Sequence, residues 1–126
     1  MIKLGKKYII GTRSSSLAIK QCQIVKEKMY KKFPELKFEI KEISTTGDRE
    51  RDKKFAEINA EGIFVREIEI ALLKGEIDLA VHSFKDLPTR LPEDLEVAAV
   101  IDRANRYDVL EKKKKKLDEL PEGSRL

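Results

Sequence analysis

The stretch from Gly75 to Pro88 constrains the fold of this chain most strongly. It contains a nearly unbroken apolar run that is too short for a helix, made up of Ile77, Leu79, Ala80 and Val81. Because a glycine and a proline bound this run, it is typical of a strand buried on both faces. Polar and titratable side chains follow at once, namely His82, Ser83, Lys85 and Asp86. Open α/β sheets bind ligands at the carboxyl ends of their strands, so these side chains are candidates for a site.

Composition limits the class of protein. A chain of 126 residues with 40% hydrophobic residues is expected to fold as one domain, or to be a piece of a larger protein. Its 27 basic and 23 acidic residues leave a net charge of only +4, which is weak support for nucleic-acid binding. The single cysteine, Cys22, excludes an internal disulfide framework and suits a reducing compartment. Since the sequence has neither a signal-peptide pattern nor a long apolar run, we expect a cytoplasmic protein that does not span a membrane.

The first part of the chain alternates strand and helix. Lys7–Gly11 is predicted to be a strand, and the hydroxyl groups within residues 12–16 are suited to capping the helix that follows. Residues 17–32 carry apolar side chains at helical spacing, and residues 36–43 alternate as a second strand. The predicted buried face of the helix consists of Ala18, Cys22, Val25 and Met29, widened by Leu17 and Ile24. A crossover of this length through a helix makes the two strands parallel.

The second part continues this alternation. Ser44–Glu61 is dense in charge and is predicted to be a mobile surface loop, either a lid over a site or a solvated excursion. A second helix is predicted from Gly62 to Gly75, leading directly into the central strand. After Pro88 and a turn, Leu95–Ile101 is predicted to be another strand. Together these elements predict an α/β domain with a mostly parallel sheet.

One feature near the end of the chain could bind a polyanion. Lys112–Lys116 are five consecutive lysines, a run that is usually a solvated loop and less often a polyanion-binding tail. No nucleic-acid recognition motif or interleaved aromatic residues accompany it. A nucleic-acid-binding domain is therefore only a minor alternative, and we expect no nucleic-acid partner.

The first candidate cluster follows the first predicted strand. Arg13, Ser14, Ser15 and Ser16 lie at the start of the predicted helix, where free N–H groups and the helix dipole favour an anion. An arginine there adds a two-pronged donor for carboxylate or phosphate. The alternative is plain helix capping with a surface arginine.

The second candidate cluster is Ser83, Lys85 and Asp86. Together they offer a proton donor, an anion clamp and a carboxylate that could stabilise developing positive charge. The alternative is an Asp-Leu-Pro turn with incidental neighbours. His82 by itself is more typical of a satisfied buried side chain, and no set of His or Cys partners supports a metal site or a thiol nucleophile.

These residues carry a resemblance to a known family. In order and spacing, residues 8 to 126 closely resemble porphobilinogen deaminase, also called hydroxymethylbilane synthase. The segments that carry the resemblance are Ile10–Ala18 with Gln21, Ser44–Asp48, Gly62–Glu67 and above all Val81–Pro88, with its specific His-Ser-x-Lys-Asp-x-Pro string. The resemblance implies a transferase of tetrapyrrole (haem) biosynthesis that deaminates porphobilinogen and joins four units into hydroxymethylbilane. It also implies a type II periplasmic-binding-protein-like α/β domain.

The resemblance assigns roles to five residues. Asp86 falls on the family's catalytic aspartate, whose carboxylate contacts pyrrole N–H groups and stabilises the cationic azafulvene that remains when ammonia departs. Arg13 and Ser15 fall on residues that hold carboxylates of the substrate or cofactor. Ser83 and Lys85, together with Asp86, fall on residues that contact the dipyrromethane cofactor. No metal is implied.

Some positions depart from the family pattern. Thr46–Glu61 falls on a flexible cover of the active site, but Glu57 and Glu61 stand where the family usually has lysines. Two acids there would repel acidic substrates if they faced the cleft, so we carry no role onto them. Arg106 replaces a common proline in the hinge segment.

The resemblance also predicts a fragment. It implies that residues 1–101 form most of a first domain and that residues 102–126 form the hinge and the beginning of a second. The cysteine that attaches dipyrromethane lies in the family's third domain and is absent here, and Cys22 cannot replace it because it lies on an apolar helix face. We therefore expect this chain alone to be inactive, with the missing portion or a second copy as its partner. The alternative function is a non-catalytic anion-binding module of the same fold.

Overall fold

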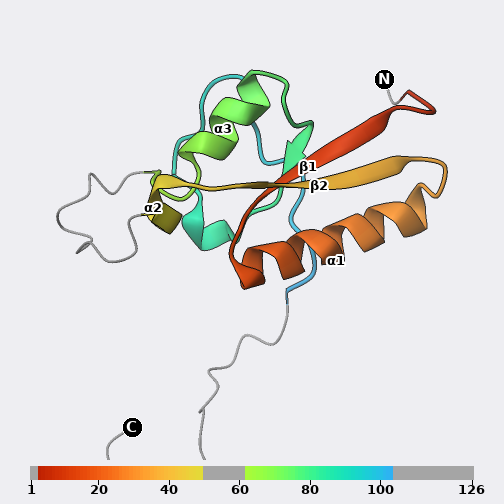
Figure 1. Cartoon of the computed structure of the whole chain (residues 1–126), viewed down its shortest axis with the longest axis horizontal. Helices are drawn as coiled ribbons and strands as arrows, with labels where there is room; N and C mark the ends of the chain where they lie inside the picture. The colour runs from red at the N-terminus through yellow and green to blue at the C-terminus, as the bar shows by residue number, and fades with distance from the viewer. Residues whose placement is uncertain (1–2, 50–61, 104–126) are drawn as a thin grey trace, which may run out of the picture.

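The computed structural model describes residues 3–49 and 62–103 (Figure 1). The described sheet consists of β1 (Lys7–Arg13), β2 (Lys37–Ile43) and β3 (Leu79–Ala80), all parallel, in the order β2-β1-β3. The helices α1 (Ser16–Lys32) and α3 (Arg66–Leu73) lie on opposite sides of this sheet (Figure 1). A short helix α2 (Thr46–Arg49) follows β2, and a 3₁₀ helix η2 (Phe84–Asp86) follows β3. The predicted α/β class and parallel β-α-β unit are confirmed.

The first helix forms as its sequence predicts. The hydroxyl of Ser15 caps α1 by accepting a hydrogen bond from the Ala18 N–H at 3.3 Å. Cys22 is fully buried, which confirms its place on the apolar face. Leu17 and Ile24, however, are 57% and 42% exposed, so they do not widen the buried face as expected.

The core on the other face of the sheet lies under α3. Ile68 and Ala71 of α3 pack with Ile77, and Ile9 and Ile43 complete the contact from the strands. Gly11 allows this close approach, because a Cβ atom there would fall on the Ile77 side chain. The helix ends at Leu73, and the predicted stop residue Gly75 follows two positions later with a φ of +70°, the left-handed conformation that glycine favours. It begins at Arg66 and not at Gly62, since residues 62–65 form a turn.

The stretch after α3 is not the central strand. β3 covers only Leu79 and Ala80, and among the described strands its single neighbour is β1. Both residues are half-buried and not buried on two faces. β1 has a partner on each side and is the central strand of the described sheet. Hydrogen bonds from Asp78 N–H to Ile9 O and from Val81 N–H to Gly11 O fix the register of β3.

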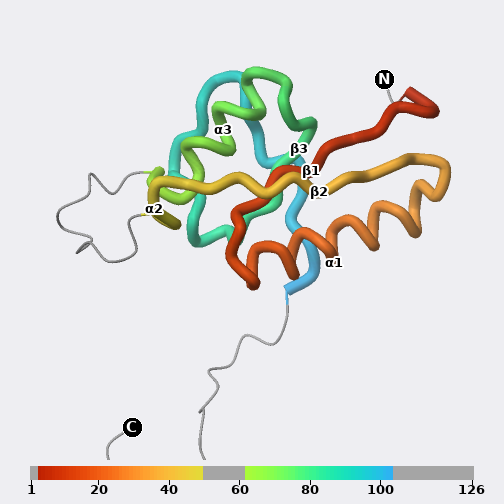
Figure 2. The backbone as a smooth tube through the Cα atoms, viewed as in Figure 1, coloured from red at the N-terminus to blue at the C-terminus, as the bar shows by residue number. Residues whose placement is uncertain are grey.

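The strand predicted at residues 95–101 is also wrong. This segment is irregular, and Val97, Val100 and Ile101 are exposed. A strand needs a hydrogen-bonded neighbour, and none of the described strands pairs with this segment. Figure 2 follows the chain as it passes the sheet and reaches α1, where Asp102 lies 3.0 Å from Lys28.

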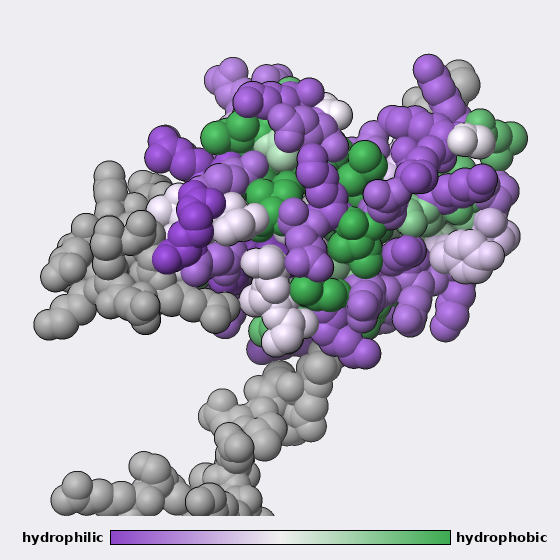
Figure 3. Space-filling view, viewed as in Figure 1, coloured by the Kyte–Doolittle hydropathy of each residue, from purple (hydrophilic) through white to green (hydrophobic). Residues whose placement is uncertain are grey.

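Hydrophilic side chains dominate the face seen in Figure 3, and small apolar areas show between them. In the described ranges, no helix combines the length and the apolar character needed to cross a membrane.

Several residues singled out in the sequence lie outside the described part of the chain, namely Lys112–Lys116, Arg106, Glu57 and Glu61. Most of the expected second-domain segment lies outside it as well.

Replacing a core residue of α3 tests this packing. Ile68→Ala should lower the free energy of unfolding by about 2–5 kcal/mol, because Ile68 is fully buried and the truncation leaves a cavity. Ile70→Ala on the same helix is the matched control, since Ile70 is 43% exposed and should cost far less. Chemical denaturation of both variants measures the difference, and equal losses would contradict the packing.

Candidate functional site

The two predicted polar clusters meet at one edge of the sheet. Because the strands are parallel, their carboxyl ends lie together: Arg13 ends β1 opposite Ile43 at the end of β2. The Val81 N–H donates to Gly11 O, so the residues that follow Val81 run beside the end of β1. The sequence therefore predicted this convergence correctly.

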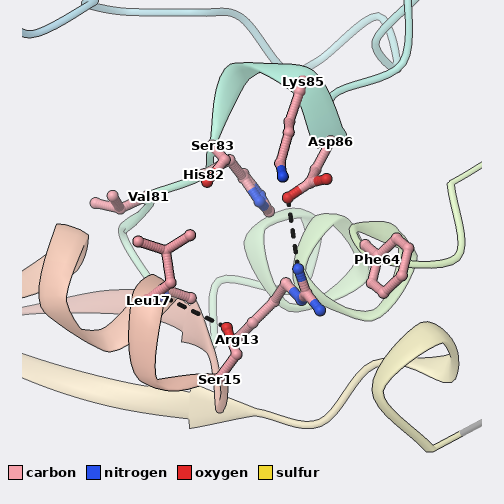
Figure 4. Close-up of a pocket in the computed structure, with 10 residues that line it drawn as sticks. Arg13, Ser15, Leu17, Phe64, Val81, His82, Ser83, Lys85 and Asp86 are labelled. Carbon is pink, nitrogen blue, oxygen red and sulfur yellow. Dashed lines mark hydrogen bonds and ion pairs between the residues drawn. The ribbon is translucent and has the colours of Figure 1, made fainter. Parts of the chain in front are cut away.

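All five residues that were assigned roles line a single cavity of about 300 Å³ (Figure 4). Lys85 and Asp86 extend into it from η2, and Arg13 reaches toward Asp86 from the end of β1 (Figure 4). Apolar groups form part of the wall. The complete lining is Arg13, Ser15, Leu17, Ala18, Phe64, Val81, His82, Ser83, Lys85 and Asp86.

The guanidinium of Arg13 lies between two carboxylates. Its Nη2 and Nε donate to Oδ1 of Asp48 at 2.6 and 3.2 Å. Its Nη1 donates to Oδ2 of Asp86 at 3.4 Å. The guanidinium carbon also lies 4.2 Å from the ring centre of Phe64, a cation–π contact. The side chains of Arg13, Asp48 and Asp86 are 16%, 7% and 17% exposed, so these charges interact in a largely desolvated site.

Asp48 is a site residue to which sequence reasoning assigned no role. The hydroxyl and the N–H of Thr45 donate to its Oδ2 at 2.7 and 3.3 Å. Burial would raise the pKa of Asp48, but the hydrogen bonds from Arg13 and Thr45 outweigh it and hold the pKa below its usual value. The available signal was its position, since it follows the end of β2 and therefore lies at the same sheet edge as Arg13.

The segment that carries Asp48 is not a mobile loop. Thr45 and Gly47 are buried, and Gly47 N–H donates to Ile63 O at 2.7 Å. Glu67 of α3 accepts hydrogen bonds from Thr46 and pairs with Arg49 at 2.8 Å. The expectation of a surface loop is therefore wrong for residues 44–49, because tertiary hydrogen bonds hold α2 against α3. Residues 50–61 lie outside the described part.

Ser83, Lys85 and Ser15 occupy distinct positions in the cavity wall. The Ser83 hydroxyl donates to Oε1 of Gln21 at 2.7 Å, which ties the start of η2 to α1. Ser15 caps α1, which confirms the predicted capping role, and its role in an anion site stays a prediction. Lys85 is exposed, and within residues 3–49 and 62–103 it forms no ion pair. It is therefore a cation available to an acidic ligand.

His82 lines the same cavity, whereas sequence reasoning favoured a satisfied buried side chain. It is half-buried. Burial lowers the pKa of His82 most, Asp86 raises this pKa, and Arg13 lowers it further, with a net shift below 6.5. His82 is accordingly neutral at pH 7.

Cysteine and metal chemistry have little support among the described residues. Cys22 is fully buried, and burial raises the pKa of its thiol to about 11, so it is a poor nucleophile. In the parts of the chain that the structure describes, no three His, Cys, Asp or Glu side chains gather in a way that could hold a metal ion.

The fold and cavity define an α/β domain with a cavity lined by charged side chains at the carboxyl edge of a parallel sheet. Residues 8–126 match the family model described as "Porphobilinogen deaminase, dipyromethane cofactor binding domain". The chain belongs to the porphobilinogen deaminase family, as its sequence motifs suggested.

Individual relatives agree with this assignment. The chain is 48% identical to the porphobilinogen deaminase of Chloroherpeton thalassium over 96% of its own length and 39% of that protein. It is 46% identical to the porphobilinogen deaminase of Desulforamulus reducens, over 95% of its own length and 39% of that protein. It is 44% identical to the porphobilinogen deaminase of a Nostoc species, over 91% of its own length and 37% of that protein. The chain thus spans about two fifths of the length of these relatives.

His82 is the single histidine of the chain, so its titration directly tests the described environment of the cavity wall. Because burial disfavours the protonated ring, His82 should titrate with a midpoint below 6.5 in the folded protein. Its contribution to stability is then present above pH 6.5 and is lost as the pH falls through the folded-state pKa. The Cε1–H resonance of His82, followed by NMR across this range, measures the midpoint. A midpoint at or above 6.5 would contradict the described environment.

Proposed function

We propose that this chain supplies the carboxylate-bearing domain of a porphobilinogen deaminase. The reaction is that of a transferase of tetrapyrrole (haem) biosynthesis, which removes ammonia from porphobilinogen and joins four units into hydroxymethylbilane. The observation that carries the proposal is the meeting of Asp86 with Arg13 at 3.4 Å in a cavity at the sheet edge. Membership of the family supports it.

Asp86 is the proposed catalytic residue. Positive charge develops on the pyrrole as ammonia leaves, so a fixed carboxylate stabilises the transition state more than the resting substrate. Asp86 is held in place because its N–H donates to Ser83 O at 3.0 Å, within η2, and Arg13 contacts its carboxylate. Its low exposure strengthens the interaction with a cation compared with bulk water.

Arg13 and Ser15 are proposed to hold the acidic side chains of the substrate. A guanidinium has five N–H donors, and Asp48 and Asp86 engage only part of this set. The Ser15 hydroxyl accepts from Ala18, which leaves its own hydrogen free to donate. The first turn of α1 adds N–H groups and a favourable dipole.

The cavity also fits a dipyrromethane, the cofactor named in the family description. Ser83, Lys85 and Asp86 would hold it, because the cation suits its carboxylates and the Asp86 carboxylate suits its pyrrole N–H groups. Leu17 and Phe64 supply apolar wall for the rings. When bound, the cofactor would supply the pyrrole at which the chain of units is extended. The cysteine that attaches it is proposed to lie outside these residues.

The wider context is proposed on the same basis. The described sheet would belong to a type II periplasmic-binding-protein-like domain that extends to residue 101, in a cytoplasmic enzyme. The remaining portion of the enzyme would come from further chain or from a partner polypeptide. The chain covers only about two fifths of the length of its relatives, which supports this arrangement.

Asp86→Asn tests the proposed role in a fused protein, which we define as this chain joined to the remainder of the Chloroherpeton thalassium relative. The substitution should lower kcat for hydroxymethylbilane formation on the order of 10²–10³-fold, because it removes the charge that stabilises the cation. Asp94→Asn is the matched control, since Asp94 is exposed and does not line the cavity. Retention of full activity by Asp86→Asn would instead favour the non-catalytic anion-binding module.

The isolated 126-residue polypeptide should not form hydroxymethylbilane from porphobilinogen. It covers about two fifths of the length of its relatives, and it supplies no cysteine at the site that could anchor the cofactor. Product formation by the purified polypeptide and by the fused protein, measured side by side, checks this expectation. Turnover by the polypeptide alone would refute it.

A further inference from the structure

We propose that Asp48 is a positioning residue that sets the orientation of Arg13 and thereby keeps Asp86 available to a cation. The proposal rests on the proposed function, because it concerns how the same site operates.

Asp48 and Asp86 contact different parts of the Arg13 guanidinium. Asp48 engages the edge formed by Nε and Nη2, with its shortest contact at 2.6 Å, whereas Asp86 is reached only by Nη1 at 3.4 Å. A long side chain with several rotatable bonds is fixed better by a bidentate ion pair than by one long contact. Phe64, 4.2 Å below the guanidinium, restricts its plane as well. The orientation of Arg13 therefore depends mainly on Asp48.

Asp48 is itself held rigidly. Two hydrogen bonds from the fully buried Thr45 fix its Oδ2, and only 7% of its side chain is exposed. The preceding helix residue, Gly47, packs so closely on Phe64 that a Cβ atom there would lie 2.5 Å from the ring. The carboxylate and the aromatic ring that restrain Arg13 thus belong to one packed unit.

The charge balance gives this orientation a function. One arginine shared by two carboxylates leaves one excess negative charge in this group, and the neighbouring His82 is neutral at pH 7. Lys85 also lines the cavity and is the other charged group there among the described residues. Without Asp48, the Arg13 side chain is free to rotate and to form a bidentate ion pair with Asp86. Such a pair neutralises the carboxylate that must stabilise the developing cation, so loss of Asp48 reduces kcat.

A double-mutant cycle in the fused protein tests this dependence on Arg13. Asp48→Asn should lower kcat at least about tenfold, with a smaller change in KM, because the orientation of the site is lost. In an Arg13→Met background the same substitution should cause no further loss, since Asp48 acts through Arg13. Asp94→Asn is the matched control, because it removes an exposed carboxylate that neither contacts Arg13 nor holds α2. Additive losses in the cycle, or an equal loss with Asp94→Asn, would overturn the proposal.

A measurement that does not depend on turnover separates this proposal from the proposed function. In ¹⁵N NMR of the fused protein, the Nε–H of Arg13 should exchange slowly with water and should lose this protection in Asp48→Asn. Thr45→Val removes only one donor to Asp48, so it should show a smaller change and serves if Asp48→Asn fails to fold. Fast exchange in the unsubstituted protein would overturn the inference. Lack of turnover with a protected Nε–H would count against the proposed function alone.

Discussion

The parallel pairing of β1 with strands on both sides is the constraint on which the site depends. Its register with β2 places Arg13 level with Ile43, and its pairing with β3 brings the chain after Val81 alongside. Three segments that are distant in sequence therefore end at one edge of the sheet. An antiparallel arrangement of either neighbour would carry one of the polar clusters to the opposite edge.

The electrostatics of the site follow from that edge. One guanidinium lies between two carboxylates in a region with little solvent, so each hydrogen bond there influences the strength of the others. Asp48 accepts the shortest hydrogen bond from Arg13, and Asp86 receives only a long contact from Nη1. Asp86 is thus fixed by the fold but not saturated by its partner. This arrangement suits a carboxylate whose task is to stabilise a charge that appears during the reaction.

Local sequence patterns predicted the elements that depend on local physics. Helical spacing and a capping hydroxyl identified α1 and the burial of Cys22, and the β-α-β order predicted the convergence of Arg13 with Asp86. Tertiary contacts decided the rest. Asp48 lies in a segment whose high charge suggests a loop, yet hydrogen bonds to distant residues order it. The apolar pattern of residues 95–101 satisfies strand propensity, but no described strand pairs with this segment.

The central claim is that the Asp86 carboxylate faces a ligand beside a restrained Arg13. A crystal structure of the fused protein with dipyrromethane bound tests it most directly. The account predicts a pyrrole N–H within hydrogen-bonding distance of the Asp86 carboxylate, with Arg13 still paired to Asp48. A structure in which Asp86 faces bulk water, or in which Arg13 and Asp86 lie on different surfaces, would contradict it.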